Sequence, residues 1–219
     1  EDIGRILSGY HALVAARVFS HSVVERLAAV CDVPVVNMLS DHSHPLQGLA
    51  DALTMVEEFG SIDDRIVAWV GDYNNVARSL GEICSMLGSH LRFAGPSGYQ
   101  ISAHDIDRFR SLGARSVSSS SDPLEAVRGA HAVHTDTWVS MGQEAEKAER
   151  IKTFGAYTVT TALMSHAAPD AIFMHCLPAY RGLEVEAAVI DGRSSRVIRQ
   201  GHNRLHSARG ALAHLMGVK

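Results

Sequence analysis

Ile66-Val67-Ala68-Trp69-Val70-Gly71-Asp72-Tyr73-Asn74-Asn75 is the stretch that decides the fold. Its apolar first half predicts a buried strand, and the glycine begins a polar turn. A helical pattern follows over residues 76–87 and ends at Gly88. Strands of a parallel sheet are buried on both faces and are connected through helices, so this strand, turn and helix predict an α/β protein of Rossmann type.

The same alternation continues toward the carboxyl end of the chain. Strand-like runs occur at residues 91–94, 117–118, 130–135 and 171–175. Between them, helical patterns occupy residues 106–112 and 159–166, and Asp122 with Glu125 resembles a capped helix start. These segments predict a mostly parallel five-stranded sheet.

The first part of the sequence predicts a second, smaller lobe. Helical patterns at residues 2–10 and 23–30 alternate with strand-like runs at 12–18 and 33–37, a small βαβ unit with too few neighbours to cover both sheet faces. Because a helix is already under way at the first residues, we expect this lobe to be only partial.

The predicted fold class is therefore α/β, two-lobed and doubly wound, with mostly parallel Rossmann-like sheets and a complete second lobe. An apolar helical pattern at residues 46–59 would link the lobes, and another at 203–216 would close the chain. The expected divisions are residues 1–43, a partial first domain; 44–60, the linking helix; 61–200, the second domain; and 201–219, the C-terminal helix.

The composition excludes several function classes. The 219 residues are 46% hydrophobic and 20% charged with a net charge of -4, and the basic residues are scattered, so no nucleic acid or anionic membrane surface is expected as a partner. No apolar run reaches the ~20 residues of a membrane span and no signal peptide is recognised, which predicts a cytoplasmic protein. Cys31, Cys84 and Cys176 are too widely spaced for a disulfide framework or a metal site.

Three polar clusters each follow a strand-like segment, and strand ends are where α/β proteins place their chemistry. They are His44-Pro45-Leu46-Gln47, Asp136-Thr137-Trp138-Val139-Ser140-Met141-Gly142 and His175-Cys176-Leu177-Pro178. The first cluster suits an anion or a polarised carbonyl, and the second suits a ligand ammonium. Simpler alternatives stay open: His44, Gln47 and Asp136 can be helix caps, and Cys176 can be a small buried apolar residue.

The turn after the deciding strand contains one glycine, whereas a dinucleotide site needs the three of G-x-G-x-x-G. A nicotinamide cofactor is therefore not expected, and a small polar ligand fits the turn better.

Taken in order, the motifs H-P-x-Q, D-x-x-x-S-M-G and H-C-L-P resemble those of the ornithine carbamoyltransferases, in the aspartate/ornithine carbamoyltransferase superfamily. The resemblance runs along the whole chain. It implies transfer of the carbamoyl group from carbamoyl phosphate to the δ-amine of L-ornithine, giving L-citrulline and phosphate in arginine metabolism, without a cofactor or metal. It also implies a homotrimer when the chain is full length, with active sites between subunits.

The resemblance assigns roles to individual residues. Carbamoyl phosphate would be bound by Arg17, His44, Gln47, Cys176, Leu177 and Arg204. Ornithine would be bound by Asn75, Asp136, Ser140 and Met141. The residues at the reacting centre would be Cys176, Asp136 and Arg204.

Two departures from the family pattern qualify these expectations. The S-x-R-T tetrapeptide that supplies most phosphate contacts does not occur in this sequence, so we expect weak or no activity from this chain alone. His202 stands where the family has glutamate before Asn203-Arg204. The alternatives are a carbamoyltransferase acting on another amine such as putrescine, or a non-catalytic amino-acid-binding fragment. Residues 139–152 have the composition of a mobile lid or, equally, of a solvated face.

Overall fold

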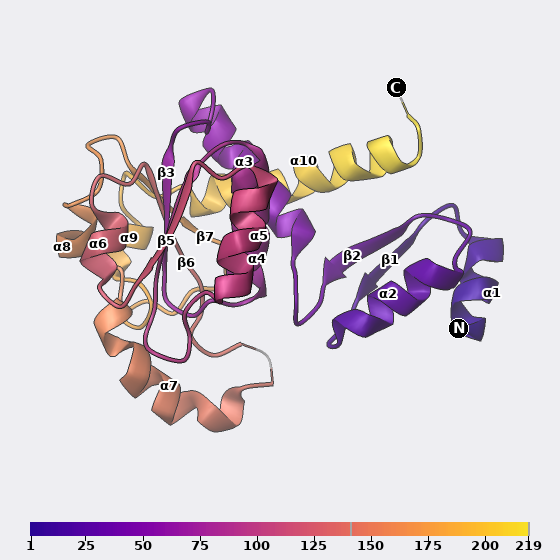
Figure 1. Ribbon diagram of the computed structural model, residues 1–219, viewed down its shortest axis with the longest axis horizontal. Helices are drawn as coiled ribbons and strands as arrows, with labels where there is room; N and C mark the ends of the chain where they lie inside the picture. Colours follow the sequence, from indigo (N-terminus) through magenta and orange to yellow (C-terminus); the bar gives the residue numbers. More distant parts are fainter. Residues whose placement is uncertain (141, 219) are drawn as a thin grey trace.

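The chain contains two parallel sheets of different size (Figure 1). The computed structural model describes residues 1–140 and 142–218. The smaller sheet pairs β1 (Val14–Arg17) with β2 (Val35–Leu39) in parallel. Helix α1 (Asp2–Tyr10) precedes it, and α2 (His21–Val30) makes the crossover that parallel neighbours require. The predicted small βαβ unit is therefore present.

The larger sheet contains five strands in the order β5-β4-β3-β6-β7, and every neighbouring pair is parallel. The strands are β3 (Ile66–Val70), β4 (His90–Ala94), β5 (Ser116–Ser120), β6 (Ala132–Thr135) and β7 (Ile172–His175). This confirms the predicted sheet. The chain order reverses at β3, which lies between β4 and β6, and such a switch point opens a crevice at the carboxyl ends of the strands.

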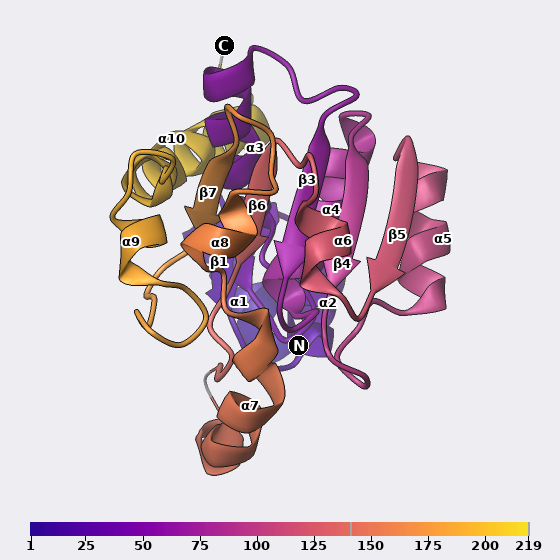
Figure 2. The same cartoon turned by 90° about the vertical axis from the view of Figure 1, so that its left-hand side faces the viewer.

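The two faces of the larger sheet are covered by different helices (Figure 2). On β3, Val67 and Trp69 join the core that contains α4 (Asn75–Met86) and α5 (Ala103–Leu112). Ala68 and Val70 point to the opposite core. That second core is covered by α6 (Pro123–Val127), α8 (Thr161–Met164) and α9 (Ala187–Ile190).

Two long helices, α3 (Pro45–Phe59) and α10 (Val197–Leu215), pack against each other, and α10 extends from the larger lobe toward the side of the smaller one (Figure 1). α3 begins with proline at its first position and ends at Gly60, where φ is 75°. α10 begins at Val197, whereas the sequence pattern predicts the start of this helix at residue 203. Its first turn is held to the end of α3 by ion pairs of Arg196 with Glu58 (2.7 Å) and Arg199 with Glu57 (2.8 Å), which an apolar pattern does not reveal.

The sequence of residues 139–152 predicts either a mobile lid or a solvated face. Among the described residues, this segment contains η1 (Glu144–Glu146) and most of α7 (Lys147–Phe154), and η2 (Gly155–Tyr157) follows it. In α7 only Arg150 and Phe154, one turn apart, are buried, so the helix has no apolar stripe in the sequence. None of the helices among the described residues is long and apolar enough to cross a membrane.

Candidate active site

A cavity of about 510 Å³ opens between the carboxyl ends of β1 and β2 on one side and β3, β6 and β7 on the other. The three polar clusters that follow strands meet in this cavity, as their positions predicted. Met141 lies outside the described residues. Each of the other predicted site residues lines the cavity: Arg17, His44, Gln47, Asn75, Asp136, Ser140, Cys176, Leu177 and Arg204.

His44 is buried at the start of α3 and lines the cavity together with Arg17 and Arg204. Its side chain makes no cap hydrogen bond, so the capping alternative is wrong, and its main-chain N–H donates to Ser79 Oγ at 2.8 Å. Burial lowers the pKa of His44 to about 4, and the positive charges of Arg204 and Arg17 contribute to that shift. The imidazole is therefore neutral near pH 7 and offers a neutral polar contact to a ligand.

Gln47 also does not cap α3, because both ends of its amide are engaged elsewhere. Its Nε2 donates to Asp51 Oδ1 at 2.7 Å, and its Oε1 accepts from Arg204 at 2.5 Å. The amide therefore has a defined orientation, with its oxygen toward the guanidinium that lines the cavity.

Asp136 stands at the end of β6 and accepts three hydrogen bonds. Its Oδ2 accepts from Asn74 Nδ2 at 2.8 Å, and its Oδ1 accepts from the Thr137 N–H at 2.8 Å and from Cys176 Sγ at 3.2 Å. No helix begins at Thr137, so the alternative of a helix cap is wrong here too. The carboxylate is held rigidly at the cavity wall, where its charge suits a ligand ammonium.

Asn74 is a site residue that the sequence reasoning did not select. Its Oδ1 caps α4 by accepting from the N–H groups of Val76 and Ala77, which leaves its amide hydrogens for Asp136. Its position in the turn between a strand and a helix is the feature of the sequence that could have identified it, because asparagine is a common helix cap there. The Asn74 side chain therefore connects the start of α4 to the Asp136 carboxylate by hydrogen bonds.

Asn75 and Ser140 lie on the same side of the cavity. Asn75 Nδ2 donates to the carbonyl oxygen of Ser40 at 2.7 Å, and because Ser40 belongs to the loop after β2, this contact joins the two lobes. The Ser140 N–H donates to Gln143 Oε1 at 3.1 Å. Both residues line the cavity together with Asp136.

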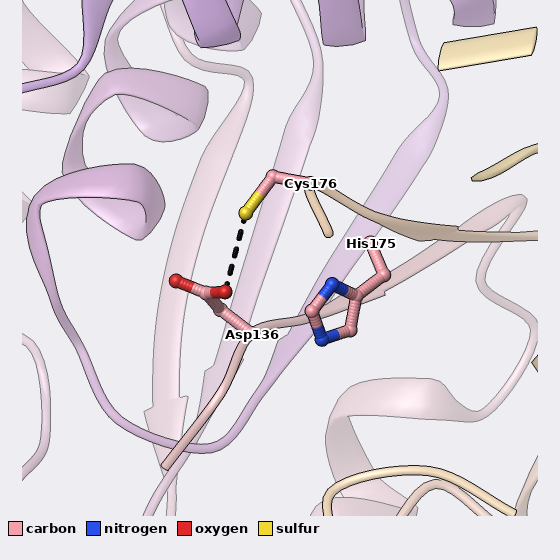
Figure 3. A group of neighbouring side chains, drawn as sticks. All are labelled: Asp136, His175 and Cys176. Atoms are coloured by element: carbon pink, nitrogen blue, oxygen red, sulfur yellow. Dashed lines mark hydrogen bonds between the residues drawn. The ribbon is translucent and has the colours of Figure 1, made fainter. Parts of the chain in front are cut away.

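Cys176 and His175 follow one another at the end of β7 and have different environments (Figure 3). The thiol of Cys176 points at Asp136, whereas the His175 ring lies to one side of that hydrogen bond. Burial and the neighbouring Asp136 carboxylate raise the pKa of Cys176 well above its usual value. Cys176 is therefore a thiol near neutral pH, unlike an activated nucleophile.

His175 shapes the loop that carries Cys176. Its Nδ1 accepts from the Leu177 N–H at 2.9 Å, and its Nε2 lies 3.3 Å from Glu184 Oε1. Leu177 has a φ of 58°, a left-handed conformation that non-glycine residues rarely adopt. The histidine thus holds an unusual backbone turn at the cavity wall.

Asp136, His175 and Cys176 also place their potential ligand atoms within 4.8 Å of one another. A metal ion there would compete with the hydrogen bond between Cys176 and Asp136 and with the contacts of both His175 nitrogens. The arrangement of these groups fits hydrogen bonding within the protein better than metal ligation.

Arg150 connects α7 to the rim of the cavity and was also missed from the sequence. Its guanidinium donates to Asp72 and to the main-chain oxygen of Trp138. It lies 4.9 Å from the centre of the Tyr99 ring. Burial raises the pKa of Asp72, although Arg150 opposes that shift. In the sequence, Arg150 stands within a run of charged residues, and nothing there distinguishes it as a buried residue that contacts the site.

Fold and site together define an α/β protein that holds small polar ligands between two lobes at a strand switch point. The chain matches the family model of the aspartate/ornithine carbamoyltransferase carbamoyl-P binding domain over residues 1–57 and that of the Asp/Orn binding domain over residues 63–215. It belongs to the aspartate/ornithine carbamoyltransferase family.

Similar proteins with established names include ornithine carbamoyltransferases from several organisms. The one from Bacillus subtilis is 43% identical over 98% of this chain and 68% of its own length. The one from Caldicellulosiruptor saccharolyticus is 47% identical over 94% of this chain and 68% of its own length. The solved ornithine carbamoyltransferase of Pyrococcus furiosus superposes with a TM-score of 0.93 at 45% identity, covering 99% of this chain and 70% of that one.

Proposed function

We propose that this protein transfers the carbamoyl group of carbamoyl phosphate to the δ-amine of L-ornithine, giving L-citrulline and phosphate. The observation that carries this proposal is the single cavity in which the H-P-x-Q, D-x-x-x-S-M-G and H-C-L-P clusters meet. Relatives at 43–47% identity that are named ornithine carbamoyltransferase support the same activity.

In the proposed reaction, the neutral δ-amine nitrogen attacks the carbamoyl carbon, and the bond from that carbon to the phosphate oxygen breaks. The phosphate leaves with the electron pair of that bond and accepts the proton that the amine loses. Negative charge develops on the carbamoyl oxygen, where fixed donors are most effective. Arg17, His44 and Arg204 line the cavity on the side of the H-P-x-Q cluster and are the donors we assign to carbamoyl phosphate. Neutral His44 would polarise the carbonyl without contributing a further positive charge.

The amine is held on the opposite side of the cavity. Asp136 would bind the α-ammonium, and Asn75, Ser140 and Met141 would contact the amino-acid end of the substrate. Cys176 and Leu177 would lie at the reacting centre. Because its pKa is raised, Cys176 orients Asp136 and the amine as a thiol and does not take the proton from the amine. Holding both reactants in place can supply about 7–11 kcal/mol of the barrier at best.

Ornithine is preferred to putrescine on the chemistry of the cavity. Ornithine brings both an ammonium and a carboxylate, and the cavity is lined by the Asp136 carboxylate and by two neutral donors, the second amide hydrogen of Asn75 and the hydroxyl of Ser140. Putrescine would leave those neutral donors without the anion that they suit.

The experiment is formation of citrulline by the purified protein, with putrescine as the competing amine. Since the sequence lacks S-x-R-T, the chain is assayed both alone and extended upstream by residues that supply that loop. Citrulline formation in either form supports the proposal. Carbamoylation of putrescine at a higher kcat/KM would replace ornithine as the substrate, and ornithine binding without turnover in both forms would favour the non-catalytic alternative.

Assembly as a homotrimer and a cytoplasmic location remain predictions that rest on the family and on the sequence. Light scattering of the purified protein at increasing concentration tests the first. A mass of three chains supports the trimer, and a monomer at all concentrations contradicts it.

A further inference from the structure

A buried carboxylate lies beneath the active-site cavity without lining it. Asp51 is on α3, one turn after Gln47, and is 1% exposed. Its Oδ1 accepts from Gln47 Nε2 and from Gln200 Nε2, each at 2.7 Å. Gln200 belongs to α10, so one oxygen atom receives amide hydrogens from both long helices.

The far ends of the two amides contact the site. Gln47 Oε1 accepts from Arg204 at 2.5 Å, and Gln200 Oε1 accepts from the main-chain N–H of His175 at 2.9 Å. Arg204 lines the cavity, and His175 begins the loop that carries Cys176. The path from Asp51 therefore reaches two separate walls of the site.

We propose that Asp51 is a positioning residue for carbamoyl transfer: its acceptor oxygen sets the direction of the Gln47 and Gln200 amides, which in turn orient Arg204 and the H-C-L-P loop. This inference rests on the proposed function. Asp51 itself does not touch the cavity, so its effect passes through the two glutamines.

A glutamine amide donates at one end and accepts at the other, so its direction matters. A carboxylate only accepts, and for this reason both NH₂ groups must face Asp51 and both amide oxygens must face away. With either amide reversed, an NH₂ group would point at the Arg204 guanidinium or at the His175 N–H, leaving buried donors opposed to donors.

The two glutamine amides require a hydrogen-bond acceptor at residue 51, and a negative charge there matters less. The groups whose charges act on it are Arg204 and Asp136, and its own charge acts on the thiols of Cys84 and Cys176. Burial raises the pKa of Asp51 to about 6. Its Oδ2 is buried and has no hydrogen-bond partner among the described residues. An asparagine could therefore keep its carbonyl oxygen at the Oδ1 position and receive both amides.

The experiment compares Asp51→Ala and Asp51→Asn with Thr54→Val as the matched control. Thr54 is buried one turn further along α3 and accepts from Asn203 Nδ2 of α10 at 2.9 Å, but among the described residues no hydrogen bond joins it to either glutamine. Steady-state kinetics of citrulline formation are measured together with the ¹⁵N side-chain amide signals of the glutamines. Gln100 serves as the internal reference because its amide donates to the carbonyl oxygen of Gly95, away from both glutamines.

Asp51→Ala is expected to shift the Gln47 and Gln200 signals and to raise the KM for carbamoyl phosphate about 10-fold or more through Arg204. The KM for ornithine is expected to rise as well, because the loop after His175 carries Cys176, which contacts Asp136. Asp51→Asn is expected to restore both signals and to bring the carbamoyl phosphate KM within about 3-fold of the parent value. Thr54→Val should lower thermal stability and leave both KM values unchanged.

Two results would overturn the inference: unshifted Gln47 and Gln200 signals in Asp51→Ala, or Asp51→Asn as impaired as Asp51→Ala. KM changes in Asp51→Ala that the Thr54→Val control reproduces would also reduce Asp51 to a structural residue and overturn the inference. The amide signals do not depend on turnover, so they test the role of Asp51 even if the proposed function fails.

Discussion

The thiol of Cys176 differs from the other cysteines in what it contacts. Cys176 donates to the Asp136 carboxylate, whereas Cys84 lies in the apolar core between α3, α4 and the sheet. A hydrogen bond to a charged group contributes about 1.5–3 kcal/mol, enough to decide the position of a carboxylate that binds substrate.

Cys176→Ala is therefore expected to raise the KM for ornithine about 10-fold and to lower kcat, because Asp136 loses one of its three donors. Initial rates at varied ornithine concentration and pH provide the measurement. Cys84→Ala is the control, since it removes a buried thiol of the core and should cost stability without changing either KM. Unchanged kinetics and pH dependence in Cys176→Ala would contradict the assigned role.

Among the helices, α4 and α5 approach each other closely because Gly81 leaves room for a ring. A Cβ placed on Gly81 would lie 2.3 Å from Phe109, which is fully buried and cannot move aside. Gly81→Ala should lower the free energy of unfolding by about 1–3 kcal/mol. Gly210→Ala in α10 meets no atom within 4 Å and should instead raise it by about 0.5–1 kcal/mol, and urea unfolding measures both. Equal effects in the two variants would refute this explanation of the packing.

Helix α7 is fastened to the ornithine side of the cavity by one buried arginine. Arg150→Gln removes the partner of Asp72, and breaking such a buried pair costs about 3–5 kcal/mol. We expect faster tryptic cleavage at the exposed Lys147 and Lys152 and a KM for ornithine raised about 10-fold. Arg108→Gln, which breaks a half-exposed pair with Glu82, is the control and should change neither. Cleavage rates that stay equal would show that Arg150 does not hold the helix.

The elements that the sequence predicted are those whose burial leaves an apolar pattern. The strands β3, β4, β6 and β7 and the helix α3 have such patterns, whereas β5 (Ser116–Ser120) buries only Val117. The first turn of α10 and the helix α7 each bury few apolar residues and depend on charged side chains, Arg199 and Arg150, whose partners Glu57 and Asp72 lie far away along the chain. The same limit applies to the site. His44, Asp136 and Cys176 were found through motifs and strand ends, whereas Asp51 and Arg150 depend on contacts between distant elements.

For the whole molecule, three buried groups control how stability changes with pH. Burial lowers the pKa of His44 to about 4 and that of His134 to about 3, and it raises the pKa of Asp51 to about 6. As pH falls below about 6.5, the unfolded chain protonates its histidines first, so their contribution to stability is lost. Asp51 acts in the opposite direction, because the folded state binds its proton first as pH falls through about 6.

Between pH 7 and 4.5, protonation of the two histidines should lower the free energy of unfolding by about 5 kcal/mol, and protonation of Asp51 should raise it by about 2 kcal/mol. The net decrease is about 3 kcal/mol. Urea unfolding at both pH values measures the difference. His134→Asn should reduce the loss, whereas Asp51→Asn should increase it, since each variant removes one side of the balance. The two variants must change the decrease in the free energy of unfolding between pH 7 and about 4.5 in opposite directions, whatever their stability at pH 7. A common direction would mean that other titrating groups control the acid stability of this fold.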